Sequence, residues 1–373
     1  MIYLDSAATS FIKPKSVEYA MINAMHSMAS PGRGSHMAAM KAADKVYECR
    51  ELISELFNFK TVERVVLTMN ATHALNIAIR SSVRRNDKVI ISGYEHNSVT
   101  RVLKDIGTDT VVASAPLFNA EAAVNSISRN IDGAKLVVIN HVSNVFGFEQ
   151  PVYDIAELCK NRGVPLILDA SQSAGVCDID AERIDAAFIA MPGHKGLLGP
   201  QGTGILLCGR DPKPLLFGGT GSDSLLQTMP EYLPDRIEAG THNVVGIAGL
   251  AEGVKYVIRK KPSAIGEYER HLCSIMAERL KNTEGFEVFS DGGKNQTGVL
   301  SVRHARMSAE SLCAEMGKRG VAARCGLHCA PLAHKTVGTL DTGTLRLSFS
   351  PFLSEYQVKT AADIIKNSIV HKK

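Results

Sequence analysis

Short runs of hydrophobic residues recur along the chain from about residue 60 onward. Several carry β-branched residues at consecutive positions, as in KVIIS at 88–92 and LVVIN at 136–140, which is typical of strands buried on both faces. Segments long enough for a crossover helix separate the first five runs, and this alternation predicts a mostly parallel sheet with helices on both sides. The expected strands cover residues 65–69, 88–92, 110–115, 136–141, 166–170, 186–191 and 204–208.

The hydrophobic pattern changes in the last three runs and again after them. The last three runs lie closer together, so an antiparallel strand is expected among them. After about residue 250 helices are expected over 251–260 and 263–281, followed by short elements at 286–289, 298–302, 308–319 and 344–349. We therefore predict a large domain of residues 16–250 and a small α+β domain formed by residues 1–15 and 251–373.

Composition and charge mainly exclude several classes of protein. The 373 residues are 45% hydrophobic and 21% charged, which excludes a mainly disordered, collagen-like or coiled-coil chain. The net charge of +4 is spread along the chain, so no nucleic-acid partner is expected. No apolar stretch reaches the ~18 residues of a membrane span, and Asp5 interrupts any signal peptide. Eight cysteines without C-x-x-C spacing favour a reduced, cytoplasmic setting.

Polar residues after the expected strands are candidates for a site, because ligands of open α/β sheets bind beyond the carboxyl ends of the strands. The segment NATH at 70–73 opens a helix, where it fits either an anion site or a simple N-cap. His96 follows the second run, and functional and structural roles are equally supported for it. Asn144 follows the fourth run and fits a turn as well as a binding site.

Two further strand-end residues are more informative. Asp169 ends the run PLILD, where a carboxylate needs a cationic or donor partner, although it could also cap the next helix. Lys195 lies among glycines in GHKGLLGPQGTG and could bind phosphate or form a Schiff base. The P-loop pattern is absent, because Gly196 follows the lysine.

One cofactor, pyridoxal 5'-phosphate, accounts for this set of residues. It needs a lysine for its aldehyde, an acid for its ring nitrogen, a planar group over the ring and a phosphate cradle at a helix N-terminus. Lys195, Asp169 and His96 supply the first three of these. The cradle would come from the helix start at Ala71, Thr72 and His73.

A second cluster lies near the C-terminus. Cys329 follows His328 in a loop within a few residues of Arg324, and cations beside a thiol favour the reactive thiolate. The alternative is an inert, buried cysteine. Arg346, in GTLRLS, could clamp a substrate carboxylate or make a surface salt bridge. A Cys/His protease is a rival interpretation, but it leaves Lys195 and Asp169 without a role.

Together these motifs resemble the class V aminotransferase family of fold-type I pyridoxal-phosphate enzymes, within it the cysteine desulfurase and selenocysteine lyase branch. The similarity runs nearly end to end, and RCGLHCAP resembles the short catalytic loop R-x-G-x-H-C-A of the SufS-like group. The motifs are YLDSAAT at 3–9, PGRGSH at 31–36, NAT at 70–72, EHNS at 95–98, HVSNVFG at 141–147, LDASQSAG at 168–175, GHKGLLGPQGTG at 193–204, EAGTHN at 238–243 and RCGLHCAP at 324–331.

The resemblance implies an α/β fold with a mostly parallel seven-stranded sheet in the large domain, plus a small α+β domain. It also implies roles around the cofactor. Lys195 would hold it as a Schiff base, Asp169 would pair with the pyridinium nitrogen, and His96 would stack on the ring and shuttle protons. Gln172 would bind the phenolic oxygen, and the phosphate would be bound by Thr72, nearby backbone amides and His194.

Further roles concern the substrate and a second subunit. Asn144 and Arg346 would hold the substrate carboxylate, and Cys329 would accept the sulfur. Thr241 would reach the cofactor phosphate of the other subunit, so a homodimer with shared active sites is expected. Two departures stand out. Pro192 replaces a serine that helps bind phosphate in the family, and a second thiol, Cys325, precedes Cys329 by four residues.

The resulting hypothesis is a cytoplasmic cysteine desulfurase that converts L-cysteine to L-alanine and leaves the sulfur on Cys329 as a persulfide. A sulfur-acceptor protein is then expected, with iron–sulfur cluster assembly as one destination. A selenocysteine lyase, or another class V reaction such as transamination or β-elimination, is the alternative. A non-catalytic carrier or regulator is disfavoured, because it needs neither Lys195 nor Cys329.

Overall fold

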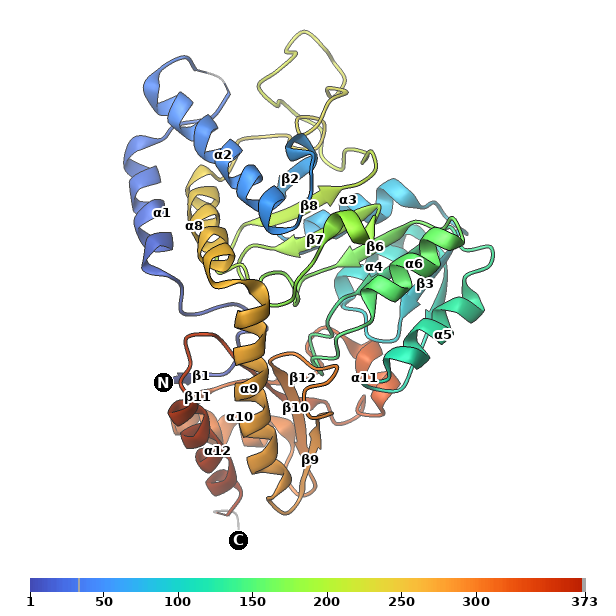
Figure 1. Cartoon of the computed structure of the whole chain (residues 1–373), viewed down its shortest axis with the longest axis vertical. Helices are drawn as coiled ribbons and strands as arrows, with labels where there is room; N and C mark the ends of the chain where they lie inside the picture. Colours follow the sequence, from blue (N-terminus) through green and yellow to red (C-terminus); the bar gives the residue numbers. More distant parts are fainter. Residues whose placement is uncertain (33, 371–373) are drawn as a thin grey trace.

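The computed structural model describes residues 1–32 and 34–370. The molecule is elongated, with a large sheet in its upper half and a smaller sheet in its lower half (Figure 1). Helix α9 (Pro262–Lys281) runs along one side from the upper half into the lower half. Strand β1 (Ile2–Tyr3) and the last helix, α12 (Glu355–Val370), both lie in the lower half, so the two ends of the chain belong to the same part of the molecule.

All seven expected hydrophobic runs form strands of one sheet. From edge to edge the order is β2 (Val65–Thr68), β8 (Gly204–Cys208), β7 (Phe188–Pro192), β6 (Leu166–Asp169), β5 (Leu136–Asn140), β3 (Lys88–Ser92) and β4 (Asp109–Ala113). Strand β8 is antiparallel to both of its neighbours, and the other pairs are parallel. This confirms the mostly parallel sheet and the antiparallel strand expected among the last three runs.

Helices cover both faces of the large sheet. Side chains of β5 alternate between them: Val137 and Ile139 pack on one face, and Leu136 and Val138 on the other. The first face is covered by α2 (Met37–Leu56), α5 (Ala120–Asn130), α6 (Val152–Asn161) and α8 (Val244–Lys260). The second is covered by α3 (Ala71–Ser82) and α4 (Asn97–Ile106). Burial on both sides explains why the strands are continuous hydrophobic runs.

Helix α8 begins at Val244, seven residues before its expected start at 251. Two glycines of this helix, Gly249 and Gly253, allow close packing. A Cβ at Gly249 would lie 2.8 Å from Met21 of α1 (Lys15–Ser27), and one at Gly253 would lie 2.4 Å from a backbone oxygen. The glycines therefore let neighbouring segments approach this helix closely. The hydrophobic pattern alone places its start too late.

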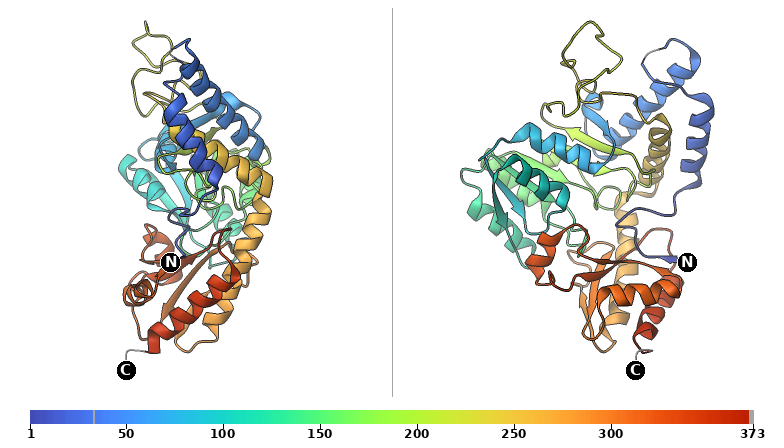
Figure 2. Two further views of the ribbon diagram at one scale, coloured as in Figure 1. Left: turned by 90° about the vertical axis from the view of Figure 1, so that its left-hand side faces the viewer. Right: turned by 180° about the vertical axis from the view of Figure 1, so that it is seen from behind.

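The small sheet is antiparallel, in the order β12 (Arg324–Gly326), β13 (Thr344–Ser348), β10 (Val299–His304) and β9 (Phe286–Phe289). Its core also contains side chains of α9, α10 (Ala309–Lys318) and α12, and α12 lies beside α9 (Figure 2). Strand β1 pairs with β11 (Val321–Ala322), and Leu4 enters the same core. The N-terminal segment thus packs with the C-terminal part of the chain. The domain boundaries at 15 and 250 stay a prediction.

The remaining elements are short: η1 (Val62–Arg64), α7 (Ala181–Ile184) and α11 (Pro331–Val337). Residues 209–243 connect β8 to α8 without a helix or strand and project at the top of the molecule in Figure 1. Among the described residues, no helix combines the length and apolar character needed to cross a membrane.

Candidate active site

A cavity of about 110 Å³ lies beyond the carboxyl ends of β3, β5, β6 and β7. The cavity lies at the position predicted for a binding site from the polar residues that follow these strands. Eight of the twelve residues expected there line it: Ala71, Thr72, His96, Asn144, Asp169, Gln172, His194 and Lys195. The structure therefore assembles most of the predicted set from five separate segments of sequence.

Asp169 is the last residue of β6 and is 3% exposed. Its Oδ1 accepts a hydrogen bond from the amide of Ser171 at 2.9 Å. The negative charge of Asp169 raises the pKa of both Lys195 and His96, opposing the larger effect of burial on each. This carboxylate is thus an electrostatic partner for cationic groups in the cavity, as its position at the end of PLILD predicted.

Lys195 lies in the loop between β7 and β8. Burial lowers the pKa of its amine to about 8, and Asp169 opposes this shift. The guanidinium groups of Arg346 and Arg324 lower it further. A lysine with this pKa is neutral far more often at pH 7 than an exposed one, and the neutral amine is the form that attacks a carbonyl or takes up a proton.

His96 caps the N-terminus of α4. Its Nδ1 accepts the amide hydrogen of Ser98 at 3.0 Å and lies 2.8 Å from the Ser98 hydroxyl. These contacts place the ring hydrogen on Nε2 when the imidazole is neutral. Burial lowers the pKa of His96, with Asp169 opposing, so the neutral ring is favoured at pH 7.

The start of α3 forms another wall of the cavity. Asn70 is the N-cap, and its side-chain oxygen accepts the amide hydrogen of His73 at 2.9 Å. The amides of Ala71 and Thr72 donate to no acceptor among the described residues, and the Thr72 hydroxyl is exposed. Donors at a helix N-terminus suit an anion.

The structure does not bring His73 into this cavity. Its ring lies 3.4 Å from the amide of Met69 and, together with Thr241, lines a separate cavity of about 340 Å³. The amide of His73 is already bonded to Asn70. Ala71 and Thr72 are therefore better placed for an anion than His73.

Two other cavity residues are tied to the N-terminal segment. Gln172 donates from Nε2 to the carbonyl of Ala7 at 2.9 Å. The ring Nδ1 of His194 lies 3.0 Å from the hydroxyl of Thr9. Burial lowers the pKa of His194 to about 4, so it is neutral at pH 7 and can bind an anion only as a hydrogen-bond donor.

Arg346 lies in β13 beneath the cavity and is 1% exposed, so it is not a surface salt bridge. Its Nη2 pairs with Asp5 at 2.7 Å, and its Nη1 donates to the carbonyl of Asn144 at 3.0 Å. The Nε of Arg346 and the Oδ1 of Asn144 are buried without a partner in the described part of the chain. Arg346 and Asn144 are thus adjacent, with unused hydrogen-bonding groups.

Cys329 lies in the loop after β12, and its side chain is exposed. Both His328 and Cys329 adopt left-handed backbone conformations, with φ of 50° and 57°. Two hydrogen bonds hold this loop against the large sheet: the amide of Asn97 donates to the carbonyl of Cys329, and Asn144 Nδ2 donates to the carbonyl of His328, both at 2.8 Å. The thiol is therefore presented beside Asn144, a cavity residue.

His328 is not one of the cations that would favour a reactive Cys329 thiolate. Burial lowers the pKa of His328 to about 2, so its ring is neutral. Its Nε2 lies 3.1 Å from the carbonyl of Thr344. The ring thus serves to fix the loop and contributes no positive charge near the thiol.

Cys325 and Cys329 occupy different environments. Cys325 packs against the core of the small sheet and contacts Cys313, whose pKa rises to about 12, mainly through burial. Its neighbour Arg324 influences Lys195 and His96 instead. Because side chains alternate along a strand, Cys325 faces away from the side on which Arg324 lies.

Comparisons with known proteins agree with this geometry. The family model "Aminotransferase class-V" matches residues 2–360. The chain belongs to this family. It is 30% identical to a probable cysteine desulfurase of Pyrococcus abyssi, over 99% of this chain and 94% of the relative. A probable cysteine desulfurase of Methanothermobacter thermautotrophicus is also 30% identical, over 98% of this chain and 94% of the relative.

Solved structures of this family have the same fold. An apo cysteine desulfurase of Thermococcus onnurineus matches with a TM-score of 0.90 and 28% identity, covering 99% of this chain and 94% of that one. The cysteine desulfurase CsdA of Escherichia coli matches with a TM-score of 0.85 at 24% identity, over 99% of this chain and 94% of that one. The predicted fold-type I α/β fold of the class V aminotransferases is confirmed. Enzymes of this family depend on pyridoxal phosphate.

Some site residues of this class V aminotransferase were missed from sequence. Asn140 and Ser171 line the cavity, and Asp5 pairs with Arg346. Asn140 is the polar last residue of the run LVVIN, as Asp169 is of PLILD, so its place in the sequence could have predicted a site residue. Asp5 lies within the quoted motif YLDSAAT, but only the tertiary fold shows its partner. In the motif PGRGSH at 31–36, Arg33 lies outside the described residues.

Proposed function

We propose that this protein is a pyridoxal-phosphate-dependent cysteine desulfurase that converts L-cysteine to L-alanine and transfers the sulfur to Cys329. One observation carries the proposal. A buried lysine, carboxylate and histidine meet in one cavity, and the loop that carries the exposed Cys329 thiol is hydrogen-bonded through the His328 carbonyl to Asn144, which lines the same cavity.

The residues of the cavity fit the cofactor. Asp169 is a buried acceptor for a protonated ring nitrogen, and Lys195 is an amine with a pKa of about 8 for the aldehyde. The amides of Ala71 and Thr72 and the Thr72 hydroxyl suit the phosphate. Pro192 lines the same cavity and offers neither a hydroxyl nor an N–H, so this helix start carries more of the phosphate binding.

When bound, pyridoxal phosphate withdraws the electron pair of the bond broken at Cα of the substrate. The chain supplies the proton transfers. Lys195 takes the proton from Cα and returns it, and its pKa near 8 suits both directions at neutral pH. The neutral ring of His96 lies over the cavity and can accept or donate at Nε2. The carboxylate of Asp169 would stabilise the positive charge on a protonated ring nitrogen of the cofactor.

Arg346 and Asn144 form the carboxylate site. Both have a buried polar atom without a partner in the described residues, and both lie where the Cys329 loop meets the large sheet. A substrate carboxylate would accept hydrogen bonds from Nε of Arg346 and from the second hydrogen on Nδ2 of Asn144, whereas Oδ1 of Asn144 needs a donor such as a substrate N–H group. Binding of this kind would direct the substrate side chain toward the loop. The thiolate of Cys329 then attacks the substrate sulfur. The carbon–sulfur bond breaks, a persulfide remains on Cys329, and a proton replaces sulfur on carbon.

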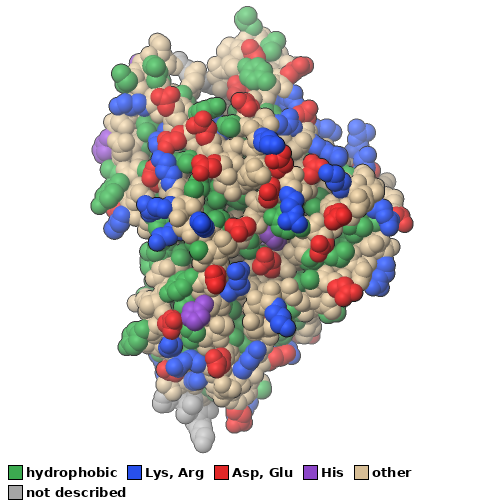
Figure 3. Space-filling model, in the orientation of Figure 1, with side chains coloured by type: hydrophobic (Ala, Val, Ile, Leu, Met, Phe, Trp, Pro, Cys, Tyr) green, Lys and Arg blue, Asp and Glu red, His purple; other side chains and the backbone are tan. Residues whose placement is uncertain are grey.

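A homodimer and a sulfur-acceptor protein complete the proposal. Large apolar side chains are exposed on α1 and in the 209–243 connection, including Tyr19, Met25, Phe217 and Leu225. Figure 3 shows hydrophobic side chains reaching the surface over α1. Apolar exposure of this kind marks interfaces. Thr241 lies in the same connection, where it would serve the partner's cofactor. An acceptor in the cytoplasm, such as an iron–sulfur assembly protein, would take the persulfide sulfur.

A product assay tests the function. The loaded enzyme is given L-cysteine and a thiol reductant, and alanine and sulfide are measured together. Equal amounts of the two are expected, because each cleaved carbon–sulfur bond yields one of each. Pyruvate with ammonia would instead indicate β-elimination, and a keto acid without sulfide would indicate transamination. Turnover of selenocysteine but not of cysteine would indicate the lyase.

A further inference from the structure

A second cavity adjoins the first and shares only Lys195 and Gln172 with it. It lies between the N-terminal segment, the loops after β6 and β7, helix α9 and the segment after β13. Its volume is about 40 Å³. A water molecule needs ~10–15 Å³ of such space, so the cavity can hold roughly three waters.

The walls of this cavity are rich in polar groups. Hydroxyls of Ser6, Ser10, Ser348 and Ser350 line it, and that of Ser6 is buried without a partner in the described chain. Apolar side chains such as Val176, Ile265 and Phe349 form the rest of the wall. The hydroxyls still supply the two to four polar partners that a buried water needs. The space beside Lys195 is therefore suited to a short chain of water molecules.

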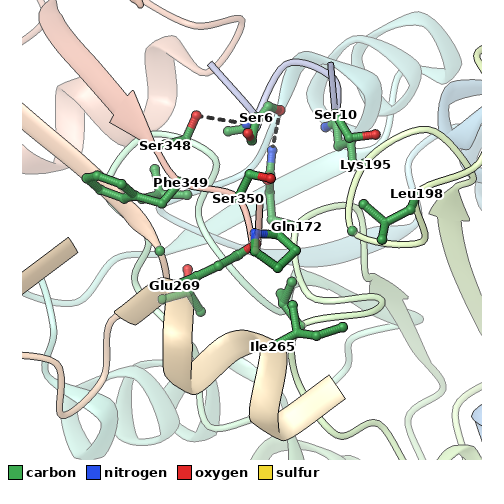
Figure 4. A pocket seen from close by; sticks show the side chains of 17 residues that line it. Ser6, Ser10, Gln172, Lys195, Leu198, Ile265, Glu269, Ser348, Phe349 and Ser350 are labelled. Carbon is green, nitrogen blue, oxygen red and sulfur yellow. Dashed lines mark hydrogen bonds between the residues drawn. The ribbon is translucent and has the colours of Figure 1, made fainter. Parts of the chain in front are cut away.

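Glu269 of α9 also lines this cavity. It is 8% exposed, and its carboxyl makes no hydrogen bond or ion pair with the residues that the structure describes. Figure 4 shows Glu269 and Lys195 at different sides of the cavity, with Gln172 and Ser350 between them. A nine-tenths buried carboxyl without a protein partner requires water, a cation or its own proton.

The fold makes room for this carboxyl. A Cβ at Gly298 would lie 2.6 Å from Cβ of Glu269 and 3.2 Å from its Oε2. Any larger residue at 298 would push the side chain away from the small sheet. The glycine thus allows Glu269 to take its position at the cavity wall.

The surroundings of Glu269 favour its protonated form. Burial raises the pKa of its carboxyl to about 8, and Arg270 on the same helix opposes this shift. The other titratable groups near this region are Cys177, Glu149 and Lys195. Burial raises the pKa of both Cys177 and Glu149, which are hydrogen-bonded to each other, and Lys195 lies across the cavity. Glu269 and Lys195 thus have pKa values in the same range, which suits reversible proton transfer between them.

We propose that Glu269 is a proton-relay residue that exchanges protons with Lys195 through water in this second cavity. The role rests on the proposed function. In the net reaction L-cysteine and the Cys329 thiol become L-alanine and the Cys329 persulfide, with no oxidant or reductant. The proton lost by the thiol enters solvent, Glu269 supplies one through Lys195 to the new C–H bond, and solvent returns a proton to Glu269.

The first experiment is independent of cofactor and turnover. Infrared spectra of the cofactor-free protein are recorded from pH 6 to 10 for wild type and Glu269→Gln. The difference spectrum is expected to contain the C=O band of a protonated carboxyl at pH 7, lost with a midpoint near pH 8. Subtraction is needed because Glu95 is also buried with a raised pKa. A difference spectrum without this band at pH 7 overturns the proposal.

The second experiment follows alanine formation by the loaded enzyme in H₂O and D₂O. Glu269→Gln is expected to lower kcat about tenfold, the scale of a weakened proton transfer, with KM for cysteine within twofold. Its solvent isotope effect on kcat should rise, and Glu269→Asp should recover part of the rate. Glu149→Gln is the matched control, because Glu149 has a raised pKa and lies near Arg270 but lines neither cavity.

The outcomes separate the two proposals. Wild-type kcat and isotope effect in Glu269→Gln would overturn the relay. An equal loss in Glu149→Gln would do the same, since it would indicate a general structural effect. A loaded wild type that forms no alanine from cysteine overturns the proposed function itself, and the infrared titration distinguishes that result from a failure of Glu269 to hold a proton.

Discussion

The two halves of the candidate site are built in different ways. On the large-sheet side, Asp169 and Lys195 follow buried strands and are held by the sheet. On the other side, Cys329 is exposed in a left-handed loop that two hydrogen bonds attach to Asn97 and Asn144. The cofactor groups therefore depend on the core, whereas the thiol depends on a few contacts. Changes in the loop should leave cofactor binding intact.

The largest effect is expected from Lys195→Ala, which removes the amine from the sheet side. Activity on cysteine should fall by about 10³-fold or more, because both the covalent attachment and the proton transfers are lost. The visible absorbance of lysine-bound cofactor should disappear as well. A variant that keeps this band would contradict the role given to Lys195.

Cys329→Ala should remove the function of the loop side of the site and leave cofactor binding on the sheet side intact. Desulfuration of cysteine is expected to fall by about 10²-fold or more, since no nucleophile remains for the sulfur, while the cofactor band persists. Alanine production by single-turnover kinetics and the absorbance spectrum are measured on the same sample. The control is Cys325→Ala, four residues away in the small-sheet core, which should change the rate less than twofold. Persulfide formation by the Cys329 variant would refute the assignment.

A smaller effect is expected from Asp5→Asn, which removes the charged partner of the buried Arg346. The unpaired guanidinium should lower the free energy of unfolding by about 1–3 kcal/mol, and KM for cysteine should rise several-fold. Urea unfolding and initial rates measure the two effects. Asp363→Asn, which breaks the exposed pair with Arg279, should change stability by less than about 0.5 kcal/mol. Equal changes in both variants would show that burial of the first pair has no consequence.

The strands were predictable because each lies between two layers of helices and is hydrophobic throughout. The helices before residue 60 were not predicted. In α1, Val17 and Ala24 are buried while Tyr19, Ile22 and Met25 are exposed, so the hydrophobic residues do not form one stripe. A periodicity argument assumes a single buried face, and it fails for a helix with apolar residues on two sides.

Site residues were predictable where the chain position implies the environment. Asp169 ends one buried strand and Lys195 follows another by three residues, and the structure brings them into one cavity. The orientation of His73 and the charge of His328 were not accessible in this way. The first depends on which side of a helix start faces the cavity, and the second on burial by residues distant in sequence.

The reversed direction of β8 has a consequence for the segment that carries Lys195. The end of β7 lies beside the start of β8, because Pro192 pairs with Gly204. Residues 193–203 therefore leave the sheet and return to it at adjacent points. The amide of Gly193 donates to the carbonyl of Thr203 at 2.9 Å and closes the segment at its base. A parallel arrangement would instead carry the chain to the opposite end of the sheet before β8 could begin, and residues 193–203 would not close at their base. One strand reversal thus turns the segment that carries Lys195 into a ring anchored at both ends on the sheet, beside the cavity that the amine serves.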